Sequence, residues 1–323
     1  MQTSAPLVTV IALCYNQSRF IADCFQGILD QTYPNLEVVA IDDCSTDGTP
    51  EIVSEWIRSR GLAWKFLQPK VNGGVCRALN HALASSKGPY ISMTAADDLW
   101  LPDKIRQQVE ILNNLPETTG VVYSDAYQMD EAGRALPKMF IEAHRQFDSF
   151  PDGDIELALW EGNFIPAMTT LIRRSCYDSV GTYDESLFAE DWDMWLRIAR
   201  GFRYKFSPHA CAKYRIVGTS LVRSKMHHIV DGSCRMCLKH LKERGLPPHI
   251  RRAAVSQLAR QAINSYKIAT PRHRWNLYKA LFSEPSVGTL AAFLCASAGI
   301  AHPQYERLRQ RLRFEKLSAK VAA

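Results

Sequence analysis

Short, mostly apolar runs alternate with longer segments of helical spacing through the first 125 residues. The runs that predict buried strands are residues 7–13, 37–41, 64–67, 90–94 and 120–125. The segments with apolar residues three and four positions apart, which predict helices, are 20–31, 50–60, 75–86 and 103–115. This alternation with short connections predicts an α/β fold on a mostly parallel, doubly wound sheet.

The rhythm breaks after residue 125. Residues 126–170 are irregular apart from a helix near 155–160, and a strand at 169–172 and an amphipathic helix at 191–199 follow. Residues 226–323 are helical in pattern and interrupted by prolines. We therefore expect one domain over 1–225, with halves 1–125 and 126–225, and a helical C-terminal region over 226–323.

The composition is that of a folded protein with a large core. Of the 323 residues, 46% are hydrophobic and 22% charged, which excludes disordered, collagen-like and coiled-coil proteins. No apolar run approaches the roughly 20 residues that a membrane-spanning helix requires.

The net charge of +6 is divided unevenly along the chain. Residues 1–225 hold 22 Lys and Arg against 28 Asp and Glu, or −6, and residues 226–323 hold 17 against 5, or +12. A basic C-terminal region predicts a partner of its own: a membrane surface, a nucleic acid or an acidic protein.

The cysteines indicate a reducing compartment. Nine are scattered without the spacing of a disulfide framework, and the N-terminal sequence lacks a basic segment followed by a cleavage site. We expect a cytoplasmic protein with free thiols.

Polar pairs follow three of the predicted strands. They are Tyr15-Asn16, Asp42-Asp43 and Asp97-Asp98. Ligands of doubly wound sheets bind at the carboxyl ends of the strands, where paired carboxylates suit Mg²⁺ or Mn²⁺ and a single carboxylate can accept hydrogen bonds from a base or ribose. Helix capping explains Asp98 and the turn after Asp43 equally well, so the residues alone leave both interpretations open.

Two further segments allow a functional and a structural interpretation. Asn72-Gly73-Gly74 precedes a helix and can present backbone N–H groups to phosphate, although a tight turn is the simpler explanation. Glu190 and Asp191 open a helix, where the helix dipole favours carboxylates, yet a carboxylate near Trp192 and Trp195 can also serve as a general base. Trp160, Trp192 and Trp195 offer aromatic faces on which sugars can stack.

Taken together, these clusters resemble the GT-A glycosyltransferases of family 2. The resemblance covers about residues 6–220 and rests on VTVIALCYNQSRFIADCFQGILDQTYPNLEVVAIDDCSTDGT, NGGVCRALNHALASSKGPYI, ADDLWLPDK and AEDWDMWLRIA. It implies a GT-A fold over 1–225, with a nucleotide-binding half (1–125), an acceptor half (126–225) and a basic helical extension.

The resemblance also implies roles for individual residues. Those placed at the nucleotide are Cys14 (through its backbone), Tyr15, Asn16, Asp43 (on the base), Asn72, Arg77, Asn80, Ala96 and Asp97. Asp97 and Asp98 match the metal-binding motif, Asp191 the general base, and Arg215 a diphosphate contact. Glu190 matches a residue that contacts hydroxyls of the sugar or the acceptor. Trp192 and Trp160 are likewise expected to contact the acceptor or the sugar.

The implied reaction is an inverting transfer from a nucleoside diphosphate sugar, by family habit UDP-linked, to a saccharide or polyprenyl-linked acceptor in cell-surface glycan synthesis. Two departures weaken the expected metal site. Ala95 stands where the metal motif often has a carboxylate, and Val217 stands where a histidine often follows Tyr-Arg-x. They motivate the alternative of a degenerate GT-A domain that binds nucleotide or glycan without catalysis.

Three C-terminal features have competing interpretations. Cys234, Cys237 and His240 have the smallest zinc spacing, but ordinary helix packing is the simpler expectation. Residues 286–301 are apolar and too short to span a bilayer comfortably, which predicts a core helix or interfacial insertion. Residues 305–321 predict a basic amphipathic helix, either packed on the body or lying on an anionic membrane at its inner face.

Other functions are less consistent with the sequence. No recognition motif accompanies the basic charge, so we expect no nucleic-acid partner. A nucleotidyltransferase would require a glycine-rich basic loop near the N-terminus, and residues 12–20 (ALCYNQSRF) do not form one.

Overall fold

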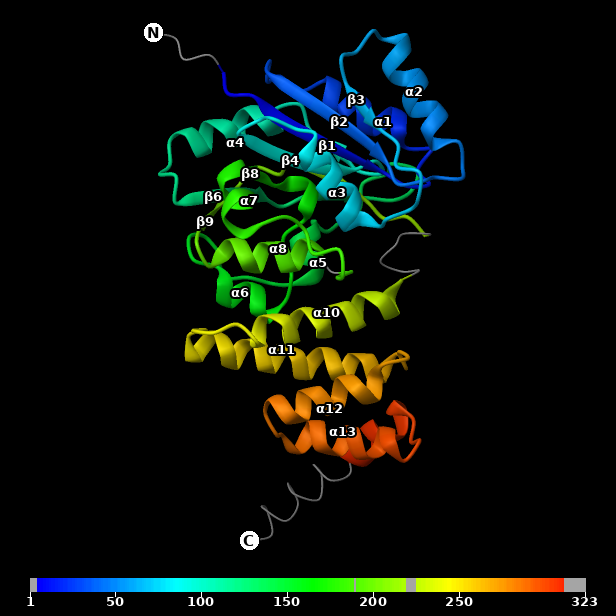
Figure 1. Cartoon of the computed structure of the whole chain (residues 1–323), viewed down its shortest axis with the longest axis vertical. Coiled ribbons are helices and arrows are strands. Elements are labelled where there is room, and N and C mark those ends of the chain that lie inside the picture. The colour runs from blue at the N-terminus through cyan, green and yellow to red at the C-terminus, as the bar shows by residue number, and fades with distance from the viewer. Residues whose placement is uncertain (1–4, 189, 219–224, 311–323) are drawn as a thin grey trace. The chain divides into compact units, whose positions relative to one another are not determined.

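The computed structural model describes residues 5–188, 190–218 and 225–310. The described chain forms two compact units, one of residues 5–186 and 190–218 and one of residues 187–188 and 225–310. Figure 1 shows the sheet with its helices in the first unit and helices in the second.

A seven-stranded sheet organises the first unit, in the order β3-β2-β1-β4-β8-β6-β9. Its strands are β1 (Val8–Cys14), β2 (Leu36–Asp42), β3 (Lys65–Leu67), β4 (Tyr90–Ala95), β6 (Thr119–Ser124), β8 (Leu171–Arg173) and β9 (Arg203–Ser207). β8 runs antiparallel to both of its neighbours, whereas the other pairs are parallel. The expected mostly parallel α/β sheet is therefore confirmed.

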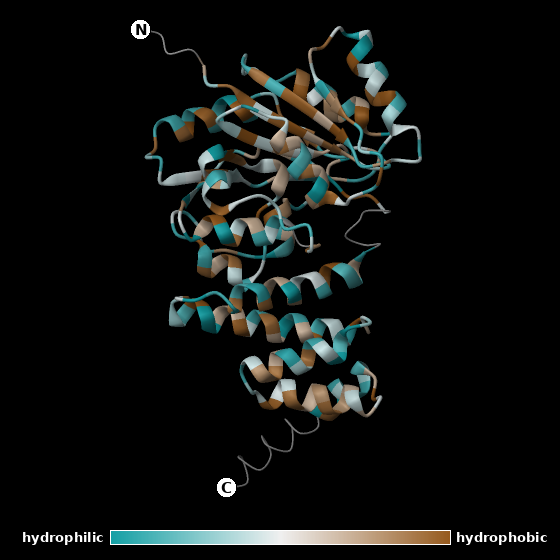
Figure 2. Ribbon diagram, viewed as in Figure 1, coloured by the Kyte–Doolittle hydropathy of each residue, from teal (hydrophilic) through white to brown (hydrophobic). Residues whose placement is uncertain are grey.

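Helices cover the sheet because its central strands are apolar on both faces (Figure 2). The helices of the first unit are α1 (Ile21–Leu29), α2 (Thr49–Ser59), α3 (Val75–Ala84), α4 (Lys104–Asn113), α5 (Phe140–His144), α6 (Glu156–Glu161), the 3-10 turn η1 (Ala167–Thr169), α7 (Arg174–Val180) and α8 (Glu190–Ala199). Val8, Val10 and Ala12 of β1 pack in one core with α1 and α4. α3 contacts β1 and β2 outside that core.

A second, three-stranded sheet lies close to the polar ends of the first. It consists of β5 (Leu99–Trp100), β10 (Ala212–Arg215) and β7 (Tyr127–Met129), in the order β5-β10-β7. β10 pairs antiparallel with β5, directly after Asp97 and Asp98, and parallel with β7. This small sheet thereby brings residue 215 to the end of β4, although the two are far apart in sequence.

The second unit is helical. Its helices are α10 (Met226–Leu241), α11 (Pro248–Lys267), α12 (His273–Ser283) and α13 (Val287–Ser297), and residues 302–310 are also helical. Residues 311–321 of the predicted basic helix lie outside the described residues. No helix in the described ranges is both long and apolar enough to cross a bilayer.

Cys234, Cys237 and His240 lie on α10 and are buried in the core of the second unit. All nine cysteines of the chain are free thiols. Within the described ranges, no group of three or more His, Cys, Asp or Glu side chains is placed to hold a metal ion. Helix packing therefore accounts for these three residues.

Candidate active site

Three polar strand ends meet at one edge of the sheet. β1 lies between β2 and β4, with Cys14 opposite Asp42 and Leu13 opposite Ala95. The backbone continues this register, since Asp43 N–H donates to Cys14 O (3.0 Å) and Ala96 N–H donates to Leu13 O (2.9 Å). The strand order reverses at β1, and ligands of open α/β sheets bind at such a switch point.

The loops after β1 and β2 hold each other in place. Asn16 has a left-handed backbone (φ 53°), and its side-chain oxygen accepts the Thr46 N–H at 2.8 Å. Its own N–H donates to Ser45 Oγ at 2.8 Å, and Ser45 is in turn bonded to the Asp42 carboxylate. Asn16 and Asp42 thus fix the loops, while the neighbouring Tyr15 is exposed at this edge.

Asp43 binds the glycine loop that precedes α3. Its two carboxylate oxygens accept the N–H groups of Gly73 and Gly74, each at 2.8 Å, and its carbonyl oxygen accepts the Asn72 amide at 2.7 Å. Gly74 has φ +79°, which a side chain would strain. The two N–H groups serve Asp43 rather than an open phosphate cradle, so the tight-turn interpretation of Asn72–Gly74 holds.

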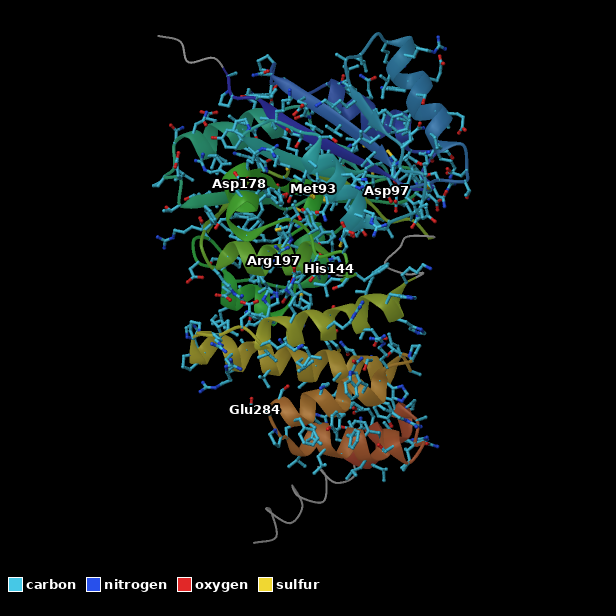
Figure 3. All side chains as sticks on the ribbon, in the orientation of Figure 1. Met93, Asp97, His144, Asp178, Arg197 and Glu284 are labelled. Atoms are coloured by element: carbon cyan, nitrogen blue, oxygen red, sulfur yellow. The ribbon has the colours of Figure 1, made fainter. Side chains whose placement is uncertain are left out.

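Asp97 and Asp98 are two adjacent carboxylates after β4, of which Asp98 is buried and Asp97 is half-buried. Burial raises the pKa of Asp97, and the Gln17 side-chain hydrogen bond and the charge of Arg215 offset part of that effect. Burial and the negative charge of Asp97 raise the pKa of Asp98 well above its usual range. Both pKa directions mean that the protein environment alone disfavours the ionised form of these two carboxylates. Figure 3 labels Asp97.

Arg215 is buried next to Asp97 and Asp98 and holds their backbone in place. Its guanidinium donates to Asp97 O (2.9 Å), Glu131 O (3.2 Å) and the Asp23 carboxylate (3.0 Å). It also lies over the Phe20 ring, 4.7 Å from the centroid, and the Arg215 N–H donates to Asp98 Oδ1 at 3.0 Å. The structure thus gives Arg215 internal contacts that position Asp97 and Asp98.

The carboxylates of Asp97 and Asp98 fit a hard divalent cation. Mg²⁺ and Mn²⁺ prefer oxygen ligands, and Mg²⁺ is commonly held by one or two carboxylates together with substrate phosphates. A bound cation would favour the ionised form of both carboxylates, which burial disfavours. Asp98 is 4% exposed, whereas Asp97 is half-buried, so Asp97 is the more accessible ligand.

Asp191 lies at the beginning of α8 with two donors on its carboxylate. Asn163 Nδ2 donates to Oδ2 at 2.9 Å, and the Trp192 N–H donates to Oδ1 at 2.6 Å. Burial raises the pKa of Asp191, and these two hydrogen bonds oppose the rise. A half-buried carboxylate with a raised pKa and a fixed orientation suits proton abstraction. The side chain of its neighbour Glu190 lies outside the described residues.

The tryptophans around α8 belong to the core. Trp160 and Trp195 are fully buried, and Trp192 is 6% exposed. Trp192 Nε1 donates to Leu159 O at 2.9 Å, and Trp160 Nε1 donates to Glu156 Oε1 at 3.4 Å. The prediction that these rings stack on sugars is therefore wrong for this structure, because packing between α6 and α8 covers their faces.

Arg77 and Asn80 of α3 hold the segment before α8. Arg77 Nε donates to Glu185 Oε2 at 3.1 Å, and the Asn80 amide pairs with both backbone groups of Tyr183. Asn80 Nδ2 also donates to Glu185 Oε1 at 3.2 Å. These contacts connect the predicted nucleotide residues of α3 to the segment that leads to Asp191.

Several residues with roles at the site gave no signal in the sequence. Asn163 and Glu131 lie in segments without a motif, and Gln17 and Asp23 lie within the first matching string without an assigned role. Only the fold brings them to Asp191, Asp97 and Arg215. A surface pocket of about 520 Å³, lined by α4 and residues 205–209, contains none of the site residues.

The chain was compared with known proteins. The sequence model described as glycosyl transferase family 2 matches residues 9–180. The chain belongs to glycosyltransferase family 2. The family match begins at β1 and includes the three polar strand ends, and it stops before Asp191.

Curated relatives agree with this assignment. An uncharacterized glycosyltransferase of Rickettsia typhi, RT0329, is 30% identical over 230 residues, which cover 71% of this chain and 70% of that protein. A Bacillus subtilis protein, TuaG, named as a candidate glycosyltransferase of teichuronic acid biosynthesis, is 28% identical and covers 68% of this chain and 83% of its own length.

Solved structures of glycosyltransferases share the fold. S. aureus TarS in complex with UDP superposes with a TM-score of 0.64 at 19% identity, over 88% of this chain and 82% of that chain. The mannosyltransferase PcManGT from Pyrobaculum calidifontis, in complex with GDP-Man and Mn²⁺, superposes with a TM-score of 0.61 at 24% identity, over 92% and 81%. The family 2 chain is thus a glycosyltransferase with the GT-A fold, as the sequence predicted.

Proposed function

We propose that this glycosyltransferase moves a sugar, with inversion, from a nucleoside diphosphate sugar to a hydroxyl of a saccharide or polyprenyl-linked acceptor. The observation that carries the proposal is the meeting of three polar strand ends at the switch point, with the half-buried Asp97 and the buried Asp98 among them. Donors of this class are bound in the TarS and PcManGT complexes, which supports the same class here.

The nucleotide is proposed to lie along the ends of β1, β2 and β4. Tyr15 is exposed at this edge, and Asn16, Asp43, Asn72 and the backbone at Cys14 and Ala96 lie at the same strand ends. Asp43 faces the base, as the family resemblance implies, and Arg77 and Asn80 flank ribose and diphosphate. UDP is the preferred donor nucleotide of the proposal, with GDP as the other nucleotide to test.

Asp191 is proposed as the general base. Its carboxylate takes the proton of the acceptor hydroxyl while that oxygen bonds to the anomeric carbon. The bond from that carbon to the diphosphate oxygen breaks in the same displacement, and the nucleoside diphosphate leaves with the bonding electrons. Asn163 and the Trp192 N–H orient the carboxylate, and their hydrogen bonds favour its ionised form against the effect of burial. General-base help of this kind contributes about 10²–10⁴-fold.

Asp97 and Asp98 are proposed to hold Mn²⁺ or Mg²⁺ against the diphosphate. A cation bound there neutralises charge on the departing group. Arg215 is placed by its contacts to position this pair, and its guanidinium is the proposed neighbour of the diphosphate.

The relatives and the free thiols support a proposed acceptor class and a proposed cellular location. TuaG is named for teichuronic acid biosynthesis, which supports a cell-surface glycan as the product class. Nine free cysteines suit the cytoplasm, where the protein is proposed to act at the inner face of the membrane.

The decisive experiment is donor turnover. The purified chain is incubated with Mn²⁺, a polyprenyl-diphosphate-linked saccharide and UDP-, GDP- or dTDP-sugars in turn, and released nucleoside diphosphate is measured. We expect release with one donor, a product of inverted anomeric configuration by NMR, and a loss of at least 100-fold in Asp191→Asn. Asp178→Asn, an exposed carboxylate on α7, is the matched control and should keep full turnover (Figure 3).

Two outcomes would contradict the proposal. Normal turnover in Asp191→Asn would remove the assigned base. Release of sugar 1-phosphate in place of nucleoside diphosphate would indicate nucleotidyl transfer from the donor. Retained donor binding without turnover in the wild type would favour the degenerate-domain alternative.

A further inference from the structure

α13 has no charged residue, and its outward face is apolar. Thr289, Ala292 and Ala296 are buried against the rest of the second unit. Val287 and Leu294, which lie on the opposite side of the helix, are 84% and 57% exposed, and Leu290 beside them is also exposed. A helix that is apolar on every face is normally covered on every side. The exposed apolar side of α13 is therefore unusual for a surface that faces only water.

α12 presents an aromatic row in the same way. Asn276, Leu277 and Ala280 face inward, whereas Trp275 and Phe282 are 53% and 70% exposed. Tyr278 lies between them, with its ring centroid 5.5 Å from that of Trp275 and 4.5 Å from that of Phe282.

The two rows form one surface because α12 and α13 pack together. The ring of Tyr278 on α12 lies 6.1 Å from that of Phe293 on α13. We name this surface the hairpin face, and it consists of Trp275, Tyr278, Phe282, Val287, Leu290 and Leu294. Figure 2 shows α13 mainly in the brown and pale colours of apolar residues. Six of the fourteen large apolar side chains exposed in the described chain lie between Trp275 and Leu308.

Basic side chains accompany the hairpin face. Residues 268–300 contain Arg272, Arg274 and Lys279 against a single acidic residue, Glu284. Arg272 and Arg274 are exposed just before the aromatic row, and Lys279 Nζ lies 4.5 Å from the centroid of the Trp275 ring. The whole range 225–310 contains 14 Lys and Arg against 4 Asp and Glu, or +10.

We propose that the hairpin face docks on an anionic lipid bilayer, with its aromatic and aliphatic side chains at the acyl boundary and its basic residues at the headgroups. Trp, Phe and Leu beside Lys and Arg have the chemistry of an interfacial membrane surface. A second copy of this chain would bring the same positive charge against itself, which charge complementarity disfavours. The inference specifies the membrane contact of the proposed function, but it stands on these residues and not on sugar transfer.

Vesicle co-sedimentation of the full chain tests the proposal. The probes are vesicles of phosphatidylcholine with about 30% phosphatidylglycerol and vesicles of phosphatidylcholine alone. We expect binding to the anionic vesicles, at least tenfold weaker binding to the neutral ones, and further weakening from 0.1 to 1 M salt.

Phe282→Ser with Leu294→Ser removes exposed apolar area without touching the core. This variant should melt at the wild-type temperature and bind anionic vesicles at least tenfold more weakly, because each side chain loses most of its transfer free energy. Leu29→Ser with Ile52→Ser, exposed on α1 and α2, is the matched control and should bind as the wild type does.

Three results would overturn the proposal. They are wild-type binding in the Phe282→Ser/Leu294→Ser variant, equal binding to neutral and anionic vesicles, and a wild-type dimer in sedimentation equilibrium that the double variant dissociates without any vesicle binding. Failure of sugar transfer in the turnover assay leaves the vesicle result unaffected, so the two proposals fail separately.

Discussion

Removing the Asn163 side chain should move the pH profile of kcat more than it lowers the maximal kcat. Asn163 Nδ2 donates to Asp191 Oδ2 at 2.9 Å, one of two hydrogen bonds that stabilise the ionised carboxylate against burial. A hydrogen bond to a charged group contributes about 1.5–3 kcal/mol, and 1.36 kcal/mol corresponds to one pKa unit. In Asn163→Ala the pKa of Asp191 should therefore rise by about 1–2 units.

The sign follows from the role of the base. Only the ionised carboxylate accepts the acceptor proton, so a higher pKa moves the acid limb of the kcat profile to higher pH. The assay is kcat against pH from 4.5 to 9 for the wild type, Asn163→Ala and the control Asn114→Ala, an exposed amide on the C-cap of α4. An unmoved acid limb with kcat reduced equally at every pH would refute the reasoning, because it would show a structural defect and not a changed base.

Three further perturbations concern the frame of the site. Glu37 accepts hydrogen bonds from Lys65, the Lys87 N–H and Thr9; burial acts to raise its pKa, but these bonds outweigh it and lower the pKa to about 2. Glu37→Gln should lower the free energy of unfolding, measured in urea, by about 3 kcal/mol at pH 7. This difference from the wild type should vanish as the pH falls from about 4.5 to about 2. Burial lowers the pKa of Lys104 to about 8, below its value in the unfolded chain. Between pH 8 and 10 the free energy of unfolding of the wild type should therefore rise, relative to Lys104→Met, by about 1.4 kcal/mol per pH unit in the same assay. Arg215→Met leaves acceptors at Asp97, Glu131 and Asp23 without their donor, so it should lower the unfolding free energy by about 3 kcal/mol. It should also weaken nucleotide binding measured by calorimetry. Unchanged nucleotide affinity would show that Arg215 does not position Asp97 and Asp98.

The sequence predicted the central strands well because burial on both faces leaves a continuous apolar run. Residues 7–13, 37–41 and 90–94 correspond to β1, β2 and β4 within a residue at either end. The polar residues that follow each run then locate the candidate site, since parallel strands of one sheet share their carboxyl edge.

Tertiary pairing decided what the sequence did not predict. β5 is two residues long and β10 four, too short for a periodic pattern, and only their pairing brings Arg215 to Asp98. α7 is only seven residues long, Arg174–Val180, which is too short for a clear helical periodicity. Trp160 and Trp192 are covered by packing, and residue type alone does not show which face of a helix is covered.

The central claim is that the three strand ends bind a nucleoside diphosphate through Asp97 and a divalent cation. Thermal unfolding with UDP, GDP and dTDP, each with and without Mn²⁺, tests it most directly on the wild type and Asp97→Ala. Ligand at 100 times its dissociation constant stabilises by about 2.7 kcal/mol, a clear shift in Tm. The account predicts a Mn²⁺-dependent shift with one nucleotide that Asp97→Ala loses. No shift with any nucleotide, or an equal shift in Asp97→Ala, would contradict it.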